Sequence, residues 1–167
     1  MRHVSDVMTR GVRSMSPNDT LVMAAQAMQE LDVGVIPVCD GDRLVGMVTD
    51  RDIVVRGVAQ GRAAENTHLD EVMSTDPCWC YDDQSVDEAV EKMRDAQIRR
   101  MPVIDHEKHL VGILSLGDVA VKDDEGTAGE ALESISEPAE PDRSSQSKAS
   151  GPAGGGSSKG KARRTPK

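Results

Sequence analysis

Residues 46–52 read Gly46-Met47-Val48-Thr49-Asp50-Arg51-Asp52, and residues 112–118 read Gly112-Ile113-Leu114-Ser115-Leu116-Gly117-Asp118. In both stretches an apolar run ends at a hydroxyl residue, and an aspartate follows three positions later. This Ser/Thr-x-x-Asp spacing is typical of a helix capping box. It is also compatible with a binding site, because a helix N-terminus attracts phosphate and an ionised carboxylate accepts hydrogen bonds from ribose hydroxyls. The motif alone does not decide between the two.

The two motifs belong to an internal repeat. A shift of 65 residues places Asp6-Val7-Met8 on Glu71-Val72-Met73, and Ile36-Pro37-Val38 on Met101-Pro102-Val103. After one inserted residue near His109 the shift becomes 66, and the two Gly-x-x-Thr/Ser-x-x-Asp segments then match each other. A single gap between two matching halves indicates a duplicated unit.

Each unit is predicted to have the order β-α-β-β-α, so the chain is predicted to have a mixed α+β fold. The expected strands are short extended runs that flank turn residues such as Asp40-Gly41-Asp42. They cover Val12–Met15, Ile36–Cys39, Leu44–Val48, Cys78–Tyr81, Met101–Ile104 and Leu110–Leu114. A second helix is expected over Arg51–Gln60, with Gly61 placed to end it.

The first helix of each unit is predicted from apolar residues at helical spacing. The core-facing residues are expected to be Leu21, Ala24, Ala25, Met28 and Leu31 in the first unit, and Val86, Ala89, Val90 and Met93 in the second. Thr20 and Ser85 are the expected N-caps, and Ser85 with Glu88 matches a capping box.

The composition excludes several classes of protein. The 167 residues include no Phe, one Trp and one Tyr, and the net charge is −9. Few aromatic rings and an acidic balance disfavour nucleic-acid binding through base stacking and phosphate contacts. The chain has no apolar run long enough to span a bilayer and no signal-peptide core at its start, so we expect no membrane partner. Three cysteines disfavour a disulfide framework and point to the cytoplasm.

Charge changes sharply beyond Lys122. Residues 123–142 contain eight acids and no base, and residues 143–167 contain seven bases and no acid, with Ser, Gly, Pro and Ala between them. Such a stretch buries too little apolar surface to offset its ordering entropy. We therefore expect a first repeat over 1–64, a second over 65–122 and a disordered tail over 123–167, with one helical turn between Glu130 and Ile135.

The repeat, its element order and both Gly-x-x-Thr/Ser-x-x-Asp segments resemble the CBS domain, the module that occurs in pairs in cystathionine β-synthase. The resemblance covers about residues 4–121. It implies two repeats packed about a pseudo-twofold axis, two clefts between them that bind adenosine compounds (AMP, ADP, ATP or S-adenosylmethionine), and a homodimer. It also implies regulation of an effector protein, which remains unknown, rather than catalysis.

The resemblance further implies that each cleft combines residues of both repeats. The first cleft would contain Thr49, Asp52, Pro77, Cys78, Ile98, Arg99 and Arg100, and the second Val12, Arg13, Val33, Gly34, Val35, Ser115 and Asp118. Arg99 and Arg100 offer cations to phosphate where the matching Gly34 and Val35 offer none. We therefore expect phosphate in the first cleft, although Asp50 and Asp76 oppose a triphosphate. As an alternative, the two arginines are merely solvated charges.

Other readings of the sequence remain open. Cys78-Trp79-Cys80 is half of a possible metal site, but no further ligand pair has suitable spacing, so we expect no metal. No motif for a catalytic nucleophile or a phosphate-binding glycine loop is present. One alternative function is a ligand-free structural dimer whose charged tail recruits a protein or nucleic acid. Another is a thiol sensor that uses Cys39, Cys78 and Cys80.

Overall fold

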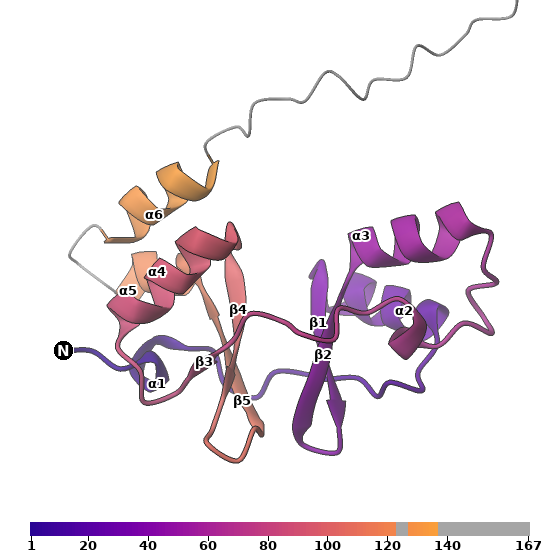
Figure 1. Cartoon of the computed structure of the whole chain (residues 1–167), viewed down its shortest axis with the longest axis horizontal. Helices are drawn as coiled ribbons and strands as arrows, with labels where there is room; N and C mark the ends of the chain where they lie inside the picture. The colour runs from indigo at the N-terminus through magenta and orange to yellow at the C-terminus, as the bar shows by residue number, and fades with distance from the viewer. Residues whose placement is uncertain (123–126, 137–167) are drawn as a thin grey trace, which may run out of the picture. The chain divides into compact units, whose positions relative to one another are not determined.

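Each repeat is built on one antiparallel hairpin (Figure 1). In the computed structural model, which describes residues 1–122 and 127–136, these hairpins are β1 (Val35–Asp40) with β2 (Arg43–Thr49) and β4 (Arg100–Ile104) with β5 (Leu110–Ser115). Val35 pairs with Thr49 and Arg100 with Ser115, which are equivalent pairs. The four hairpin strands predicted from the sequence are confirmed.

The remaining predicted strands are shorter than expected. Cys80 and Tyr81 form β3 (Cys80–Tyr81), which runs parallel to β4. In the first repeat the Val12–Met15 stretch contributes one parallel bridge, between Met15 and Val38. The second repeat therefore has a three-stranded sheet and the first a two-stranded sheet.

The helices α2 (Leu21–Leu31) and α4 (Val86–Ala96) begin at the predicted caps. The Thr20 hydroxyl accepts a hydrogen bond from the backbone N–H of Met23, and the Ser85 hydroxyl accepts one from Glu88. The predicted core face of α4 is buried throughout. The prediction for α2 needs correction. Ala25 and Leu31 are exposed and Ala27 is buried in their place, because the apolar stripe is narrower than the sequence suggested.

The second helix of the first repeat is continuous but irregular. It begins as α3 (Asp50–Asp52), widens into a π-helical segment over Ile53–Gly57, and tightens into a 3-10 turn over Val58–Gln60. Gly61 then adopts a φ of 69°, as predicted for a helix stop. The matching helix of the second repeat is α5 (Leu116–Lys122).

The hydrophobic core of each repeat contains a segment that belongs to the other repeat in the sequence. Val4 and Val7 of α1 (Val4–Val7) pack with α4 and β5, in the core of the second repeat. Their equivalents Leu69 and Val72, in and beside the 3-10 turn Leu69–Glu71, pack with α2 and β1 in the first core. The chain thus exchanges equivalent segments between the repeats, which ties the two units together.

A further helix, α6 (Thr127–Ser136), packs on α4 and α5. Ala131 is fully buried there, and Ile135 packs against the second core. The sequence analysis predicted a disordered tail with one helical turn between residues 130 and 135. The structure instead has a longer helix over Thr127–Ser136, which these apolar contacts hold in place. The rest of the predicted tail lies outside the described residues.

The two hairpin tips bond to each other through an equivalent pair of contacts. The Leu44 N–H donates to the Lys108 carbonyl at 3.1 Å, and the Leu110 N–H donates to the Asp42 carbonyl at 2.9 Å. Because Leu44 matches Leu110 in the repeat, the two bonds relate the hairpins by an approximate twofold axis.

Among the described residues, no helix has the length and apolar character needed to span a membrane.

Candidate functional site

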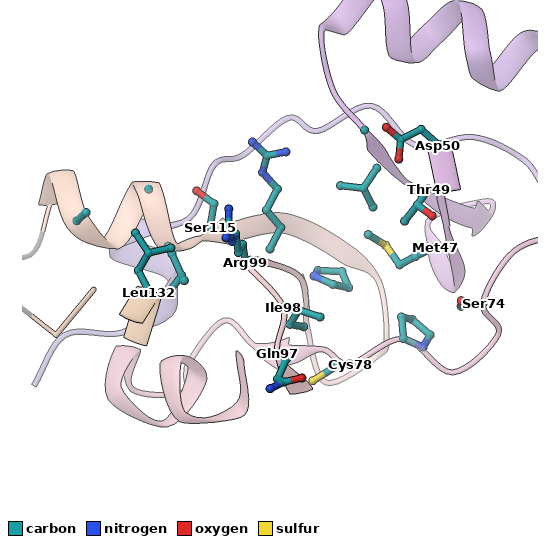
Figure 2. Close-up of a pocket in the computed structure, with 18 of the residues that line it drawn as sticks. Met47, Thr49, Asp50, Ser74, Cys78, Gln97, Ile98, Arg99, Ser115 and Leu132 are labelled. Carbon is teal, nitrogen blue, oxygen red and sulfur yellow. The ribbon is translucent and has the colours of Figure 1, made fainter. Parts of the chain in front are cut away.

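A cavity of about 1060 Å³ lies between the two repeats. Figure 2 shows Thr49 and Asp50 on one side of it, and Arg99, Ser115 and Leu132 on the other. The ends of β2 and β5 bring both hydroxyl residues to its walls, because each strand stops where its Gly-x-x-Thr/Ser-x-x-Asp segment turns into a helix.

Most residues predicted for the first cleft line this cavity. They are Thr49, Pro77, Cys78, Ile98, Arg99 and Arg100. From the second predicted cleft, Gly34, Val35 and Ser115 line the same cavity. One space therefore collects residues that the sequence analysis divided between two clefts.

The remaining predicted residues do not line the cavity. Arg13 forms an ion pair with Glu30 at 3.1 Å. Val33 packs against the first core, and Val12 is half-buried. The carboxylates of Asp52 and Asp118 accept backbone hydrogen bonds at the N-termini of their helices.

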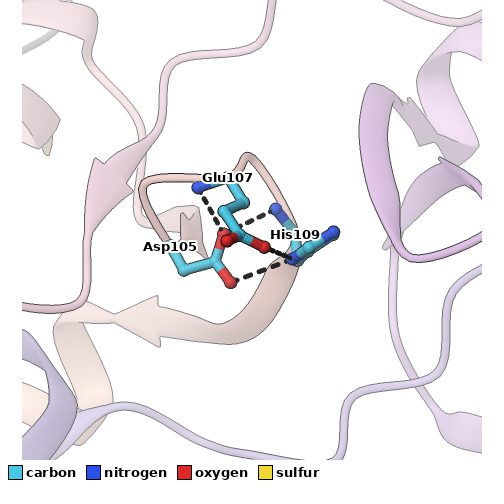
Figure 3. Close-up of side chains that lie close together, drawn as sticks. All are labelled: Asp105, Glu107 and His109. Atoms are coloured by element: carbon cyan, nitrogen blue, oxygen red, sulfur yellow. Dashed lines mark hydrogen bonds and ion pairs between the residues drawn. The ribbon is translucent and has the colours of Figure 1, made fainter.

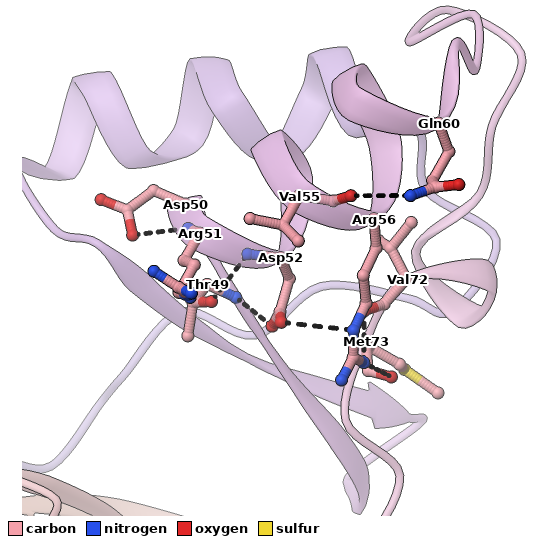
Figure 4. Close-up of polar contacts among 9 residues, drawn as sticks. All are labelled: Thr49, Asp50, Arg51, Asp52, Val55, Arg56, Gln60, Val72 and Met73. Carbon is pink, nitrogen blue, oxygen red and sulfur yellow. Dashed lines mark hydrogen bonds and ion pairs between the residues drawn. The ribbon is translucent and has the colours of Figure 1, made fainter. Parts of the chain in front are cut away.

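Both Ser/Thr-x-x-Asp segments are helix caps. The Thr49 hydroxyl accepts from the Asp52 N–H at 3.0 Å, and the Asp52 carboxylate accepts from the Thr49 N–H at 3.0 Å (Figure 4). Arg56 reaches Asp52 at 3.9 Å and donates to the Val72 carbonyl. Ser115 caps its helix in the same way. Thr49 also lines the cavity, so capping and binding are compatible at this position.

The charges around the cavity are mixed. Arg99 and Arg100 precede and begin β4, while Asp50 and Asp76 lie on the wall contributed by the first repeat and the connection between repeats. Asp50 lies against Gly34, where a Cβ atom would be 3.0 Å from the carboxylate. Two cations and two anions thus face one space, and the rest of the lining is largely apolar or neutral. Such a lining suits a ligand with an apolar ring and few charges.

Several lining residues were missed by the sequence analysis. Gly129 and Leu132 come from α6, in the stretch predicted to be disordered. The signal that could have found this helix is the apolar spacing of Ala131, Leu132 and Ile135 within the acidic segment. Met47, Ser74, Gln97 and Pro102 were also missed. Met47 and Pro102 lie in the repeated segments quoted above, but they were not singled out there as site residues.

The three thiols are poorly suited to redox sensing at neutral pH. Burial raises the pKa of Cys39 and of Cys78, and it raises the pKa of Cys80 to about 12. The reactive form of cysteine is the thiolate, so a raised pKa leaves little of it. Cys78 lies 3.6 Å from the Met101 sulfur and packs as a small apolar side chain.

Three side chains with metal-ligand chemistry meet in the β4–β5 turn (Figure 3). Asp105 accepts hydrogen bonds from the backbone N–H groups of Glu107 and His109, and its second oxygen lies 3.1 Å from the His109 ring. The Glu107 carboxylate is 3.5 Å from the same ring. These bonds are those of a tight turn, so the grouping is explained without an ion.

His106 is expected to titrate above its ordinary value of 6.5, because the Asp83 carboxylate, 2.9 Å from Nε2, raises its pKa. The bond stabilises the fold below pH 6.5, and this stabilisation is lost as the pH rises through the pKa of His106 in the folded protein. A proton NMR titration of Asp83→Asn should give a lower His106 midpoint, while the exposed control Asp95→Asn leaves it in place. An unchanged midpoint in Asp83→Asn would contradict this assignment.

A known protein-family model matches this chain twice, once in each repeat. The family model described as "CBS domain" matches residues 4–57 and 69–125. The chain belongs to the CBS domain family. The fold predicted from the resemblance is thereby confirmed, including the tandem arrangement of the two repeats.

Two named relatives match most of this chain. CBS domain-containing protein YhcV of Bacillus subtilis is 44% identical over 137 residues, which is 81% of this chain and 96% of YhcV. Hypoxic response protein 1 of Mycobacterium tuberculosis is 42% identical over 122 residues, covering 72% of this chain and 84% of that protein.

Two solved structures extend the comparison. Hypoxic Response Protein I with two coordinated zinc ions aligns with a TM-score of 0.67 at 38% identity, over 72% of this chain and 98% of that one. The CBS domain pair of protein MJ0100, in complex with 5-methylthioadenosine and S-adenosyl-L-methionine, aligns with a TM-score of 0.64 at 25% identity, over 72% and 98% of the two chains.

Proposed function

We propose that this CBS domain pair is a regulatory module, not an enzyme, that binds an adenine nucleotide in the cavity between its repeats and signals to a partner protein. The observation that carries the proposal is the joint lining of one cavity by Thr49, Ser115 and the Arg99–Arg100 pair. The adenosine ligands of the MJ0100 pair support the same class of ligand.

The size and polarity of the cavity support a single nucleotide. Its volume of about 1060 Å³ lies just above the range of roughly 300–1,000 Å³ that is typical of small-molecule sites. Apolar residues such as Ile98, Met47 and Val35 offer a surface for the adenine ring. Arg100 offers a charge-assisted bond to phosphate, and the Thr49 hydroxyl offers a neutral polar contact.

The mixed charge favours a ligand with little negative charge. Asp50 and Asp76 offset Arg99 and Arg100, so each phosphate beyond the first adds repulsion without adding a cation. We expect AMP to bind more tightly than ATP. S-adenosylmethionine, which carries a positive sulfonium, is the competing candidate, because its sulfonium could be stabilised by Asp50 or Asp76.

Signalling requires that the ligand prefer one arrangement of the repeats. A ligand in the cavity touches both repeats, while the hairpin tips are joined by the Leu44–Lys108 and Leu110–Asp42 backbone bonds. Occupancy would therefore change the angle between the repeats about these tips, and with it the surface offered to a partner.

The proposal is tested by isothermal titration calorimetry of the full chain with AMP, ADP, ATP and S-adenosylmethionine. Arg100→Ala should weaken AMP binding by about tenfold to a hundredfold, the loss expected for one charge-assisted hydrogen bond. Arg10→Ala is the matched control, because Arg10 is exposed and donates to the Ser5 carbonyl away from the cavity. Absence of heat with all four compounds, or equal affinity in both variants, would refute the proposal.

A further inference from the structure

α6 presents different side chains on two sides of one short helix. Ala131 is fully buried where α6 packs on α4 and α5, and Ile135, one turn further on, packs against the second core. Gly129 lines the cavity instead, together with Leu132 three positions later (Figure 2). Residues three or four positions apart lie on one side of an α-helix. One side of α6 therefore holds it on the second repeat, and the adjacent side forms part of the cavity wall.

Leu132 has apolar surface that a ligand in the cavity could cover. It is 44% exposed, although it is a large apolar residue on a docked helix. The cavity that it lines also contains the apolar side chains of Met47 and Ile98. Covering such a side chain with the apolar part of a ligand removes its surface from water and stabilises the complex.

The size of the cavity indicates how α6 acts on a ligand. With α6 docked, the cavity still has a volume of about 1060 Å³. Small-molecule sites typically measure roughly 300–1,000 Å³, so one nucleotide fits without displacing the helix. This space favours α6 as an additional wall of the site over α6 as a plug that competes with the ligand.

The docking of α6 depends on few contacts. The helix has ten residues, which is too short for stability on its own in water, so its structure depends on packing against the second repeat. Among the α6 side chains that the structure describes, Ala131 alone is buried, and Gly129 lowers the helix propensity. One further contact, between Leu132 and a ligand, would therefore shift the balance toward the docked helix.

We propose that α6 is a third wall of the nucleotide site and that a bound nucleotide holds this helix on the second repeat. The inference rests on the proposed function, because it takes the nucleotide to lie in the cavity. The coupling is reciprocal. If the nucleotide stabilises the docked helix by a given factor, undocking the helix weakens nucleotide binding by the same factor. Occupancy of the cavity then sets the fraction of chains in which α6 is docked.

The first part of the test is the affinity of the full chain for AMP, measured by titration calorimetry. Leu132→Ala removes the side chain that lines the cavity. Ala131→Gln undocks the helix, because its larger polar side chain does not fit the fully buried site. Each variant should bind AMP about threefold to tenfold more weakly. The double variant should bind no more weakly than Ala131→Gln alone, because an undocked helix no longer presents Leu132.

The second part is hydrogen exchange at the α6 amides of Leu132 and Ile135. Saturating AMP should slow this exchange in the wild-type chain by the factor that Ala131→Gln loses in affinity, and it should not slow it in Ala131→Gln. Glu133→Gln is the matched control, because it introduces the same residue at an exposed position of the same helix. It should keep both the wild-type affinity and the protection by AMP.

The opposite results separate this inference from the proposed function. Wild-type AMP affinity in both Leu132→Ala and Ala131→Gln would overturn the inference and leave nucleotide binding intact. Faster exchange in α6 with AMP, or tighter binding by Ala131→Gln, would show that the helix blocks the site. Failure of the wild-type chain to bind AMP would count against the proposed function and overturn the inference with it. If circular dichroism shows that Ala131→Gln does not fold, Leu132→Ala, at a partly exposed site, provides the test.

Discussion

The full chain is expected to unfold about 5–10 °C higher when AMP is present at about a hundred times its dissociation constant. A ligand that binds only the folded state at this excess stabilises it by about 2.7 kcal/mol. For a domain of this size, each kcal/mol raises the unfolding temperature by roughly 2–4 °C. Differential scanning calorimetry with and without AMP measures the shift.

The choice of variant decides whether this shift reports binding. Asp52→Ala is a poor probe, because Asp52 holds the helix cap with Thr49 and contacts Arg56, so its loss lowers stability without any ligand. Arg100 is exposed at the start of β4 and lines the cavity. We expect Arg100→Ala to lose most of the AMP shift while unfolding near the wild-type temperature without ligand. A full shift in this variant would contradict the predicted contact.

Leu69→Ala is expected to lower the free energy of unfolding by about 2–5 kcal/mol, the cost of emptying a buried leucine site. Leu69 is fully buried in the first core although it belongs to the second repeat of the sequence. Urea unfolding of the full chain measures the loss. Val121→Ala, at a largely exposed site, should change stability by less than about 0.5 kcal/mol.

The part of the fold that is destabilised by Leu69→Ala tests whether the two repeats exchange segments. In Leu69→Ala, hydrogen exchange should accelerate first at the buried amides of the first repeat, such as those of Val38 and Val48, and less at Met101 and Val103 of the second. Acceleration confined to the second repeat would mean that Leu69 stabilises its own half. A loss below about 1 kcal/mol would mean that the site collapses around the smaller side chain.

The internal repeat allowed most of the fold to be predicted. The same apolar pattern twice, at equivalent positions, identified both hairpins and the caps at Thr20 and Ser85. The exchange of Val4 and Leu69 could not be predicted, because the two segments have equivalent sequences and each fits either core. Only the path of the chain between repeats decides which core each one enters.

The site was predicted less completely for two physical reasons. Asp52 has the chemistry to accept ribose hydroxyls, but its carboxylate lies in the cap, a role that the same spacing also specifies. α6 was missed because its acidic neighbours dominate the composition, while its contribution depends on Ala131 and Leu132 meeting residues distant in sequence. Thr49, Arg99 and Arg100 were assigned to the first cleft from the resemblance to the CBS domain, and all three line the cavity.

The most direct test of nucleotide binding between the repeats is an amide NMR titration of the full chain with AMP. We predict that the resonances of Thr49 and Val35 from the first repeat shift together with those of Ile98, Arg100 and Ser115 from the second, with one common dissociation constant. Shifts confined to one repeat, or no shifts at saturating AMP, would contradict binding in the shared cavity.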